Sequence, residues 1–329
     1  MNPQLSTLEM PWFSPRDAGA TVKLALGTMN FGKRTPLAES ERILARAIER
    51  GVVLLDTANV YNDGESERIV GRALAGRREA LLVATKAGLA RDGGRAEGLS
   101  RAAIERAIDG SLSRLGTDYV DLYYLHAPDP KAPIAETIDA IAELLRKGRI
   151  RHFGVSNYAS WQILEIMRLC EERGIARPAV SQVIYNLLIR QIEVEYLRFA
   201  AAYPIHTTVY NPVAGGLLAG RYRPGDEVVS GTRFDKNQLY QRRYWSARMF
   251  ELVEQYRALS EAEGMTLLDF AYAWLAGAPG VDSILVGPAT VEHLDAAIEA
   301  CARTISPAAR AKAAELHKAH AGTDASYAR

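Results

Sequence analysis

Four side chains of complementary chemistry follow short apolar runs of the sequence. They are the carboxylate of Asp56, the phenol of Tyr61, the ammonium of Lys86 and the imidazole of His126. Together these groups suit reversible carbonyl reduction, in which the oxygen receives a proton while hydride reaches the carbon. We expect Tyr61 to donate the proton and His126 to orient the carbonyl oxygen. A free phenol has a pKa of about 10, so we expect Lys86 to favour its ionised form and Asp56 to hold that ammonium in place.

Each of these residues also has an ordinary structural explanation. An Asp before a Thr often caps a helix, a Lys after a strand is often solvated, and a single His is often a satisfied core residue. Lys86 has a chemical alternative as well, as the Schiff-base nucleophile of an aldolase that needs no nicotinamide. Joint catalysis is favoured because all four side chains follow the carboxyl ends of predicted strands.

Eight short β-branched or aliphatic runs alternate along the chain with longer stretches of helical period. Near-continuous apolar runs are typical of strands that are buried on both faces of a parallel sheet. The predicted strands are Lys23–Leu26, Val52–Asp56, Ala80–Lys86, Val120–His126, Arg151–Ser156, Ala179–Ile184, Ile205–Tyr210 and Asp282–Val286. The predicted helices are Leu37–Arg50, Glu65–Leu74, Ser100–Leu115, Ile134–Lys147, Ser160–Arg173, Val194–Ala202, Ala247–Glu263, Thr266–Ala276 and Val291–Ala300.

Eight strand and helix units without a composition break predict one α/β domain over residues 1–329, a closed (β/α)8 TIM barrel. An open, doubly wound sheet is the alternative. Within the domain we expect an N-terminal extension (1–20), a substrate loop (222–246) and a C-terminal helix and tail (306–329) that lies over one mouth of the barrel. Glycine suits the left-handed cap at the end of a helix. Four helical stretches are followed by such a residue: Gly51, Gly116, Gly148 and Gly174.

Composition and charge exclude several functional classes. Forty Lys and Arg against 39 Asp and Glu leave a formal charge of +1, which is too small for nucleic acid as a partner. The sequence has no signal-like start and no run of 18 apolar residues, so we expect a cytoplasmic protein without a membrane partner. The two cysteines, Cys170 and Cys301, and the six scattered histidines predict neither a disulfide nor a metal site. Both a monomer and a homo-oligomer are compatible with the sequence.

Hydride transfer needs a cofactor, and a nicotinamide is the expected source. No G-x-G-x-x-G follows a predicted strand, which disfavours a Rossmann site. Instead, Gly215–Arg221 and Gly287–Thr290 follow the seventh and eighth strands, where barrels frequently bind phosphate. A merely flexible glycine-rich loop is the alternative. The aromatic ring of Tyr210 could stack on the nicotinamide, and three polar side chains could bind its carboxamide: Ser156, Asn157 and Gln182.

Four stretches of the sequence resemble the aldo-keto reductases: LLDTANVY at 54–61, ATK at 84–86, DLYYLH at 121–126 and GVSN at 154–157. The likeness runs from about residue 24 to residue 300. Further stretches, HAPD at 126–129 and YNPVAGGLLAG at 210–220, are most like the branch of aflatoxin-aldehyde and succinic-semialdehyde reductases. The resemblance implies a barrel enzyme that reduces an aldehyde or ketone to an alcohol. It also implies a catalytic tetrad, formed by Asp56, Tyr61, Lys86 and His126.

The resemblance places the cofactor around the mouth of the barrel. The implied cofactor-binding residues are Gly27, Thr28, Met29, Asp56, Ser156, Asn157, Gln182, Tyr210, Asn211, Pro212, Ala214, Gly216, Leu217, Gly220, Arg221, Gly287, Thr290 and His293. Many relatives carry Gln and Asn where this chain has His293 and Ala297, so contacts with the adenosine half of the cofactor are expected to differ. Thr290 remains available to a 2'-phosphate, which favours NADPH, with NADH as the alternative.

The long loop 222–246 is expected to decide which small-molecule carbonyl compound binds. Its Arg243-Tyr244-Trp245 segment and the chain ending Tyr327-Ala328-Arg329 resemble the aldehyde-reductase branch. An acidic or dicarbonyl aldehyde could dock there, whereas an exposed basic helix start and a frayed tail are the alternative. The expected substrate contacts are Tyr61, His126, Arg243, Tyr244 and Arg329. A resemblance to potassium-channel beta subunits leaves open a nicotinamide-binding sensor with little turnover.

Overall fold

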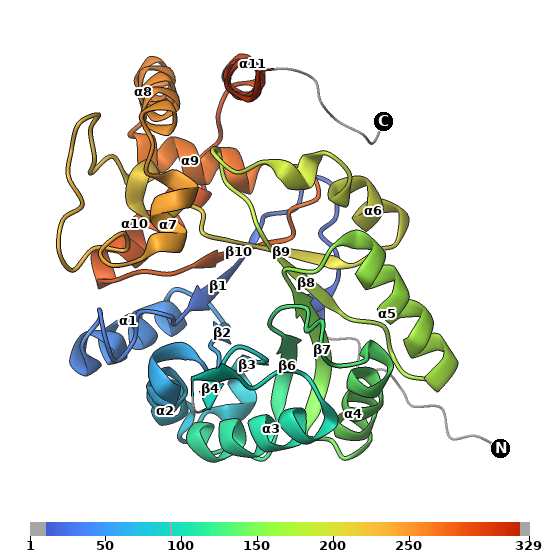
Figure 1. The fold of residues 1–329 in the computed structure, drawn as a ribbon. Coiled ribbons are helices and arrows are strands. Elements are labelled where there is room, and N and C mark those ends of the chain that lie inside the picture. Colours follow the sequence, from blue (N-terminus) through green and yellow to red (C-terminus); the bar gives the residue numbers. More distant parts are fainter. Residues whose placement is uncertain (1–10, 93, 323–329) are drawn as a thin grey trace.

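Eight parallel strands close into a barrel in this computed structural model, which describes residues 11–92 and 94–322 (Figure 1). Around the barrel they follow the order β1, β2, β3, β6, β7, β8, β9 and β10. Their bounds are β1 (Lys23–Gly27), β2 (Leu54–Asp56), β3 (Leu82–Ala87), β6 (Val120–Leu125), β7 (Ile150–Ser156), β8 (Val180–Ile184), β9 (His206–Tyr210) and β10 (Ser283–Val286). The predicted (β/α)8 barrel is confirmed.

Helices surround the barrel. They are α1 (Leu37–Glu49), α2 (Glu65–Leu74), α3 (Arg101–Leu115), α4 (Ile134–Arg146), α5 (Ser160–Arg173), α6 (Tyr196–Ala202), α7 (Gln238–Tyr244), α8 (Ala247–Ala262), α9 (Leu267–Ala276), α10 (Val291–Cys301) and α11 (Pro307–Ala321). The four glycines predicted to end helices all have a positive φ, between 63° and 79°. Each therefore supplies the left-handed turn that a side chain would disfavour.

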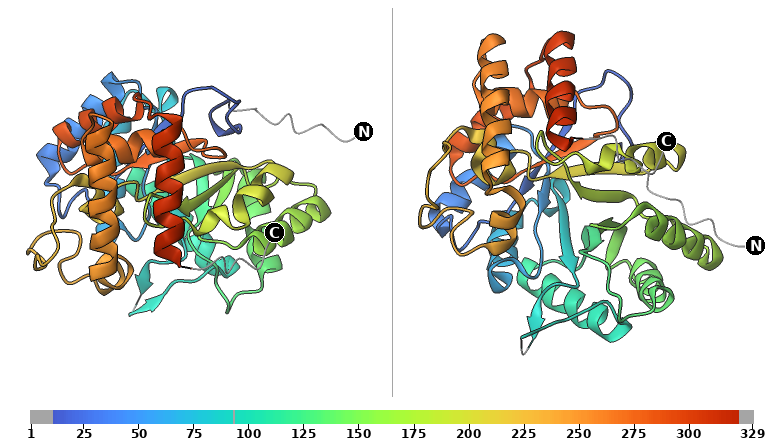
Figure 2. Two further views of the ribbon diagram at one scale, coloured as in Figure 1. Left: turned by 90° about the horizontal axis from the view of Figure 1, so that it is seen from above. Right: turned by 45° about the horizontal axis from the view of Figure 1, so that its top comes forward.

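The structure departs from the sequence prediction in four places. A hairpin of β4 (Arg91–Asp92) and β5 (Arg95–Ala96) and the helix α7 were not predicted. The third strand begins at Leu82, because residues 78–80 form a short 3-10 turn. The terminal helix α11 packs beside α8 at the outer edge of the molecule, and not over a mouth of the barrel (Figures 1 and 2).

Inward and outward side chains alternate along the strands and form two apolar layers. The layer inside the barrel contains Ala25, Leu54, Ala84, Leu122 and Val180. A larger layer fills the space between the strands and the helices. Buried runs on both faces explain why the strands lack a polar side in the sequence.

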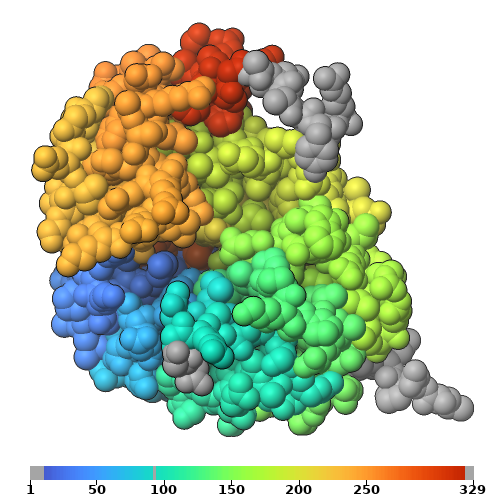
Figure 3. Space-filling model, viewed as in Figure 1, coloured from blue at the N-terminus to red at the C-terminus, as the bar shows by residue number. Residues whose placement is uncertain are grey.

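Residues 11–16 close the amino-terminal mouth of the barrel. Trp12 stacks on His206, with ring centroids 5.2 Å apart. Lys23 Nζ donates to the carbonyl oxygens of residues 11, 12 and 14, at 2.8 to 3.1 Å. The guanidinium of Arg16 donates to the carbonyl oxygens of Ala276 and Ala278. The opposite, carboxyl-terminal mouth is hollowed at its centre (Figure 3).

The two cysteines are free and buried. Cys170 lies within α5 and Cys301 is the last residue of α10. Burial raises the pKa of both thiols to about 12, so neither is a reactive thiolate near neutral pH. Within the described ranges, no helix has the length and apolar character needed to cross a membrane.

Candidate active site

The four predicted catalytic side chains come together at the carboxyl ends of neighbouring strands. Asp56 ends β2, Lys86 lies in β3, His126 follows β6, and Tyr61 begins the turn η2 (Tyr61–Gly64). Lys86 Nζ is 5.2 Å from the centroid of the Tyr61 ring. The ring centroids of Tyr61 and His126 are 5.9 Å apart, and the rings meet edge to face.

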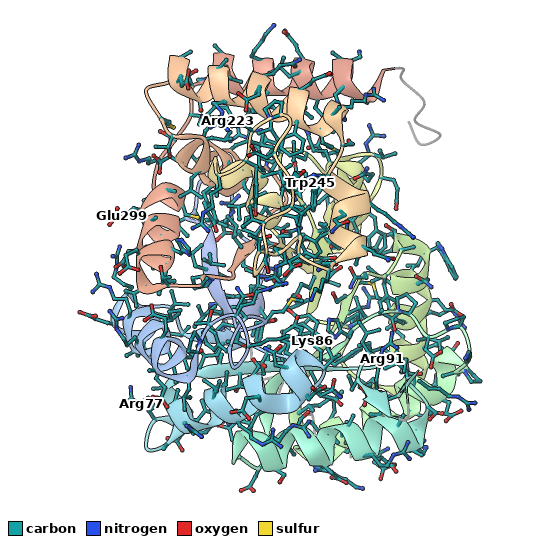
Figure 4. The ribbon with its side chains drawn as sticks, turned by 60° about the vertical axis from the view of Figure 1, so that its left-hand side comes forward. Arg77, Lys86, Arg91, Arg223, Trp245 and Glu299 are labelled. Atoms are coloured by element: carbon teal, nitrogen blue, oxygen red, sulfur yellow. The ribbon has the colours of Figure 1, made fainter. Side chains whose placement is uncertain are left out.

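Lys86 and Asp56 form an ion pair in which neither side chain has more than 1% of its surface exposed. Lys86 Nζ also donates to the carbonyl oxygen of Thr57, at 2.8 Å. In Figure 4 the lysine lies inside the ribbon, whereas Arg77 and Glu299 point away from the molecule. Neither a solvated lysine nor a helix-capping aspartate describes this arrangement.

The other carboxylate oxygen of Asp56 is also occupied. Gln182 Nε2 donates to Asp56 Oδ2 at 2.9 Å. The ring of Tyr124 lies beneath the ion pair, with its centroid 5.3 Å from Lys86 Nζ. A Cβ on Gly154 would approach that ring to 2.8 Å, so the strand next to Tyr124 needs a glycine there. The ammonium is thus held between two aromatic rings and two oxygen acceptors.

The electrostatics of the site keep the phenol protonated. Burial raises the pKa of Tyr61, and the Asp56 carboxylate raises it further. Burial lowers the pKa of Lys86, while Asp56 opposes that change. The pKa of Tyr61 therefore lies above its ordinary value, because desolvation outweighs the nearby cations at this site. Tyr61 consequently carries its proton at neutral pH, as a proton donor must.

His126 is buried but not satisfied. No atom in the described ranges forms a hydrogen bond with its buried Nδ1. Burial and the Lys86 ammonium lower the pKa of His126 to about 3, so the imidazole is neutral at physiological pH. A neutral imidazole still has one N–H to donate. The explanation of His126 as a satisfied core residue therefore does not hold.

Three of the residues predicted to bind nicotinamide form one hydrogen-bonded group at the mouth. The hydroxyl of Tyr210 donates to Asn157 Oδ1 at 2.7 Å, and Asn157 Nδ2 donates to Ser156 Oγ at 3.0 Å. Burial raises the pKa of Tyr210 to about 12, and the Arg243 guanidinium opposes that rise. Gln182, the fourth of these predicted residues, donates from its amide nitrogen to Asp56.

The two predicted phosphate loops lie side by side. Arg221 Nη2 from the loop after β9 donates to His293 Nε2 at 2.5 Å. Thr290 caps α10, because its Oγ1 accepts the backbone N–H of His293. The glycine-rich segment forms a 3-10 turn, η5 (Ala214–Ala219), and the side chain of Asn211 accepts the N–H of Gly215 at 2.9 Å. This segment is a hydrogen-bonded turn, and it brings a guanidinium to the start of α10.

A sequence model described as the aldo/keto reductase family matches residues 23–318 of the chain. The protein is an aldo-keto reductase. As a member of this family it is an oxidoreductase that acts on carbonyl groups with a nicotinamide cofactor. The donor set at the mouth fits such a cofactor, because it combines an aromatic ring, amide and hydroxyl groups, and a cationic loop beside a helix N-terminus.

Three similar proteins illustrate this membership. The human protein named aflatoxin B1 aldehyde reductase member 2 is 36% identical over 296 residues, which cover 83% of this chain and 80% of that protein. Human aflatoxin B1 aldehyde reductase member 4 is 34% identical over 292 residues, covering 82% and 86%. A probable voltage-gated potassium channel subunit beta of Arabidopsis thaliana is 32% identical over 265 residues, covering 79% and 80%. The predicted likeness to the aflatoxin-aldehyde reductases is confirmed.

The other predicted cofactor contacts of this reductase differ in accessibility. Thr28, Ala214 and Leu217 have no exposed surface, neither on the side chain nor on the backbone. Met29, by contrast, is 44% exposed beside the mouth. The N–H groups of two predicted residues, Gly216 and Gly220, donate to carbonyl oxygens of their own turn. The remaining positions follow strand ends: Gly27 ends β1, Asn211 and Pro212 follow β9, and Gly287 follows β10.

The predicted substrate contacts are only partly accessible. Tyr244 has no exposed surface, and its hydroxyl accepts hydrogen bonds from Asn186 and Asn211, at 3.1 and 2.7 Å. It therefore supports the loop from beneath and does not line the mouth. Arg243 is half-buried and acts to lower the pKa of Tyr210. The charge of Arg243 therefore lies near the hydrogen-bonded group of Tyr210, Asn157 and Ser156. Arg329 lies outside the described residues.

Two residues near Tyr61 were missed by the sequence analysis. Arg233 acts to lower the pKa of Tyr61 and Tyr240 acts to raise it. Arg233 also reaches across the mouth, where its Nη2 donates to Asn30 Oδ1 at 2.7 Å. The basic and aromatic composition of 232–245 was the available signal, but it was applied only to the end of this loop. In the described ranges, no three His, Cys, Asp or Glu side chains gather as a metal-binding group.

Proposed function

We propose that this protein reduces an aldehyde or a ketone to an alcohol, with Tyr61 as the proton donor and NADPH as the reductant. The observation that carries the proposal is the position of Tyr61 beside a buried Lys86–Asp56 pair. Few structural roles need a fully buried ammonium next to a phenol, because desolvating a charge is costly.

Each of the four proposed catalytic residues has its own role in the proton transfer. His126 is neutral, so it can donate a hydrogen bond to the carbonyl oxygen without adding charge. Tyr61 then gives its proton to that oxygen, while bound NADPH supplies the hydride for the carbon. This leaves Tyr61 as a tyrosinate. Lys86 Nζ lies 5.2 Å from the centroid of its ring. Asp56 holds the lysine in place, so the ammonium is ready to stabilise the phenolate as it forms.

The cationic loop pair supports NADPH over NADH. Arg221 and His293 meet beside Thr290 at the start of α10. A helix N-terminus and a guanidinium both favour a phosphate monoester, which NADPH has and NADH lacks. Tyr210, with the amide group of Asn157, is the proposed contact for the nicotinamide ring.

The substrate is proposed to be an aldehyde that carries a second polar or acidic group. Two arginines of the 222–246 loop, Arg233 and Arg243, act electrostatically on Tyr61 and Tyr210, respectively. The names of the human relatives refer to an aldehyde. A positive wall beside the proton donor would orient an anionic or dicarbonyl aldehyde with its reactive carbonyl toward Tyr61.

The proposal is tested by binding and turnover in one cuvette. Tryptophan fluorescence is followed during titration with NADPH and, separately, NADH. Succinic semialdehyde, methylglyoxal and 4-nitrobenzaldehyde are then added while the absorbance of the reduced nicotinamide is recorded. We expect tighter binding of NADPH, and turnover with at least one aldehyde.

Two other results would contradict the proposal. Tight binding without turnover on any aldehyde would match the nicotinamide sensor. Binding of neither nucleotide, with borohydride trapping of a carbonyl compound on Lys86, would match the aldolase. The aldolase gains no support from the geometry, because Lys86 Nζ is buried and already bound by Asp56 and Thr57.

A further inference from the structure

Five polar side chains without any exposed surface lie behind the catalytic strands. They are Thr28, Thr57, Ser66, Glu67 and Thr85, and we call them the buried polar cluster. Lys86 faces the barrel interior, so its neighbour Thr85 faces the helices on the other side of β3. Of the five, only Thr28 was predicted to take part in the function, as a cofactor contact. Polar groups this deeply buried are retained only where their hydrogen bonds are made.

Ser66, in the first turn of α2, joins the ends of β1 and β2. Its Oγ lies 2.7 Å from Thr28 Oγ1 and 2.9 Å from Thr57 Oγ1. Thr28 Oγ1 in turn donates to the carbonyl oxygen of Asp56 at 3.0 Å, and the carbonyl oxygen of Thr57 accepts Lys86 Nζ at 2.8 Å. The Ser66 hydroxyl therefore contacts Thr28, which is bonded to Asp56, and Thr57, which is bonded to Lys86.

Glu67, the next residue, joins β3 to α3. Thr85 Oγ1 donates to Glu67 Oε1 at 2.6 Å, and Arg114 Nε donates to Glu67 Oε2 at 2.6 Å. Both carboxylate oxygens are thus used in short hydrogen bonds, one of them charge-assisted. Since Thr85 directly precedes Lys86, the carboxylate holds the strand at the residue before the catalytic lysine.

The same contacts hold the turn that carries Tyr61 into α2. Asn62, Asp63 and Gly64 all have a positive φ, of 51°, 54° and 81°. A Cβ on Gly64 would lie 2.5 Å from Arg114 Cδ, so the arginine passes directly against this turn on its way to Glu67. Three successive left-handed residues persist only where the surroundings determine them.

We propose that Ser66 and Glu67 are positioning residues that set the spacing of the proposed catalytic side chains. Ser66 acts on Asp56 and Lys86 through Thr28 and Thr57. Glu67 acts on Lys86 through Thr85, and on the Tyr61 turn through Arg114. The inference rests on the proposed function of this site. It adds residues between the strands and the helices to the groups that support catalysis.

Glu67 also places a negative charge behind β3. Its carboxylate acts to raise the pKa of Lys86, against the effect of burial. Without that charge the ammonium loses its proton at lower pH. A purely structural role for Glu67 predicts lower stability alone, whereas a positioning role predicts a lower kcat and a basic limb of the pH profile that moves to lower pH.

The test compares Glu67→Gln with a matched control, Asp121→Asn. Asp121 is also a buried carboxylate paired with arginine, Arg78 at 2.8 Å and Arg151 at 3.3 Å, and it accepts the N–H of Val83 at 2.9 Å. It lies near the start of β6, away from the mouth. Both variants are expected to lower Tm, because each leaves an arginine without its partner.

Only Glu67→Gln is expected to change the reaction. We expect kcat to fall by about 10- to 100-fold, with the basic limb shifted to lower pH and the Kd for NADPH changed less than about twofold. Thr85→Val, which removes one hydrogen bond and keeps the volume, is the second variant if Glu67→Gln does not fold. For it we expect kcat to fall by about fivefold.

The outcomes separate this inference from the proposed function. Wild-type kcat and pH profile in Glu67→Gln, or in Thr85→Val if only that variant folds, would overturn the inference while the reductase stands. An equal loss of kcat in Asp121→Asn would overturn it too, because the effect would then be general destabilisation. Absence of turnover in the unmutated protein would contradict the proposed function itself, and the inference with it.

Discussion

Lys86 is the residue whose surroundings are hardest to explain without chemistry. Its ammonium has no exposed surface, one carboxylate partner and one carbonyl partner. Burying such a charge for stability alone is inefficient, since apolar residues of similar volume often serve as well. The free-energy cost of burying the ammonium is explained if its charge is needed beside Tyr61 when the phenol ionises.

Replacement of the lysine by an apolar side chain of similar length tests this reasoning. We expect Lys86→Met to lower kcat by about 100-fold or more, because the phenolate of Tyr61 loses its nearest cation. The variant also leaves Asp56 without its ion pair, so Tm is expected to fall. Steady-state rates of NADPH oxidation measure the first effect and thermal unfolding the second. A rate near that of the unmutated protein would remove Lys86 from the mechanism.

Residue types at strand ends indicated the four proposed catalytic side chains, which the fold brings together, but not their hydrogen-bond partners. The carbonyl oxygen of Thr57 binds Lys86, and every residue type has such an oxygen, so no pattern could indicate it. Gln182 was predicted at the carboxamide of the cofactor, but its amide nitrogen donates to Asp56, a partner that the sequence did not indicate. This hydrogen bond depends on the side-chain rotamer of Gln182 and on a partner 126 residues away in sequence.

At the scale of elements, the turn between β2 and α2 is the most constrained segment of the site. Gly64 combines a φ of 81° with an arginine stem in the space where a Cβ would lie. We expect Gly64→Ala to cost stability through both strain and overlap, by more than about 1 kcal/mol. Gly148→Ala is the matched control, because Gly148 has a φ of 68° and nothing near its missing Cβ. Equal unfolding free energies for the two variants would show that Arg114 is not an obstacle.

The start of α10 is the element that we expect to choose the cofactor. Arg221 is exposed and reaches His293 across the two loops. Arg221→Ala is expected to weaken the binding of NADPH by about 1 kcal/mol or more, because a charge-assisted contact with the 2'-phosphate is lost. The affinity for NADH should remain nearly constant. Fluorescence titrations with both nucleotides measure the difference, and a parallel loss for both would place the arginine elsewhere on the cofactor.

Elements with a long apolar period were predicted well, and short or polar elements were not. The hairpin of β4 and β5 has two residues in each strand and no alternation to detect. The place of α11 depends on distant partners, since Arg190 Nη1 and the hydroxyl of Tyr256 both donate to the carbonyl oxygen of Ala313. No local pattern contains those contacts, so the predicted position over a mouth was wrong.

At the scale of the whole molecule, the two ends of the barrel have separate tasks. Trp12, Lys23 and His206 seal one mouth, while the proposed chemistry occupies the other. Eight apolar runs that alternate with helical stretches, without a composition break, were enough to predict the closed barrel. The sealed end was not predicted, because the N-terminal extension has no regular period before Lys23.

Buried histidines make the stability of the whole molecule depend on pH. Burial lowers the pKa of His126 to about 3 and that of His206 to about 4, against about 6.5 in the unfolded chain. Below pH about 6.5 the unfolded chain therefore binds protons that the folded protein does not, so the free energy of unfolding falls with falling pH. We expect a lower Tm at pH 5 than at pH 7, and a smaller difference for His206→Asn. A Tm that rises on acidification would contradict this.

The most direct measurement of the central claim is the turnover and cofactor affinity of Tyr61→Phe. The change removes one hydroxyl and almost none of the surface, so proton donation is lost and the fold is kept. We predict that kcat falls by about 100-fold or more, while the Kd for NADPH stays within about twofold of the unmutated value. Near-normal turnover, or an equal loss of turnover and NADPH binding, would contradict the assignment of Tyr61 as the proton donor.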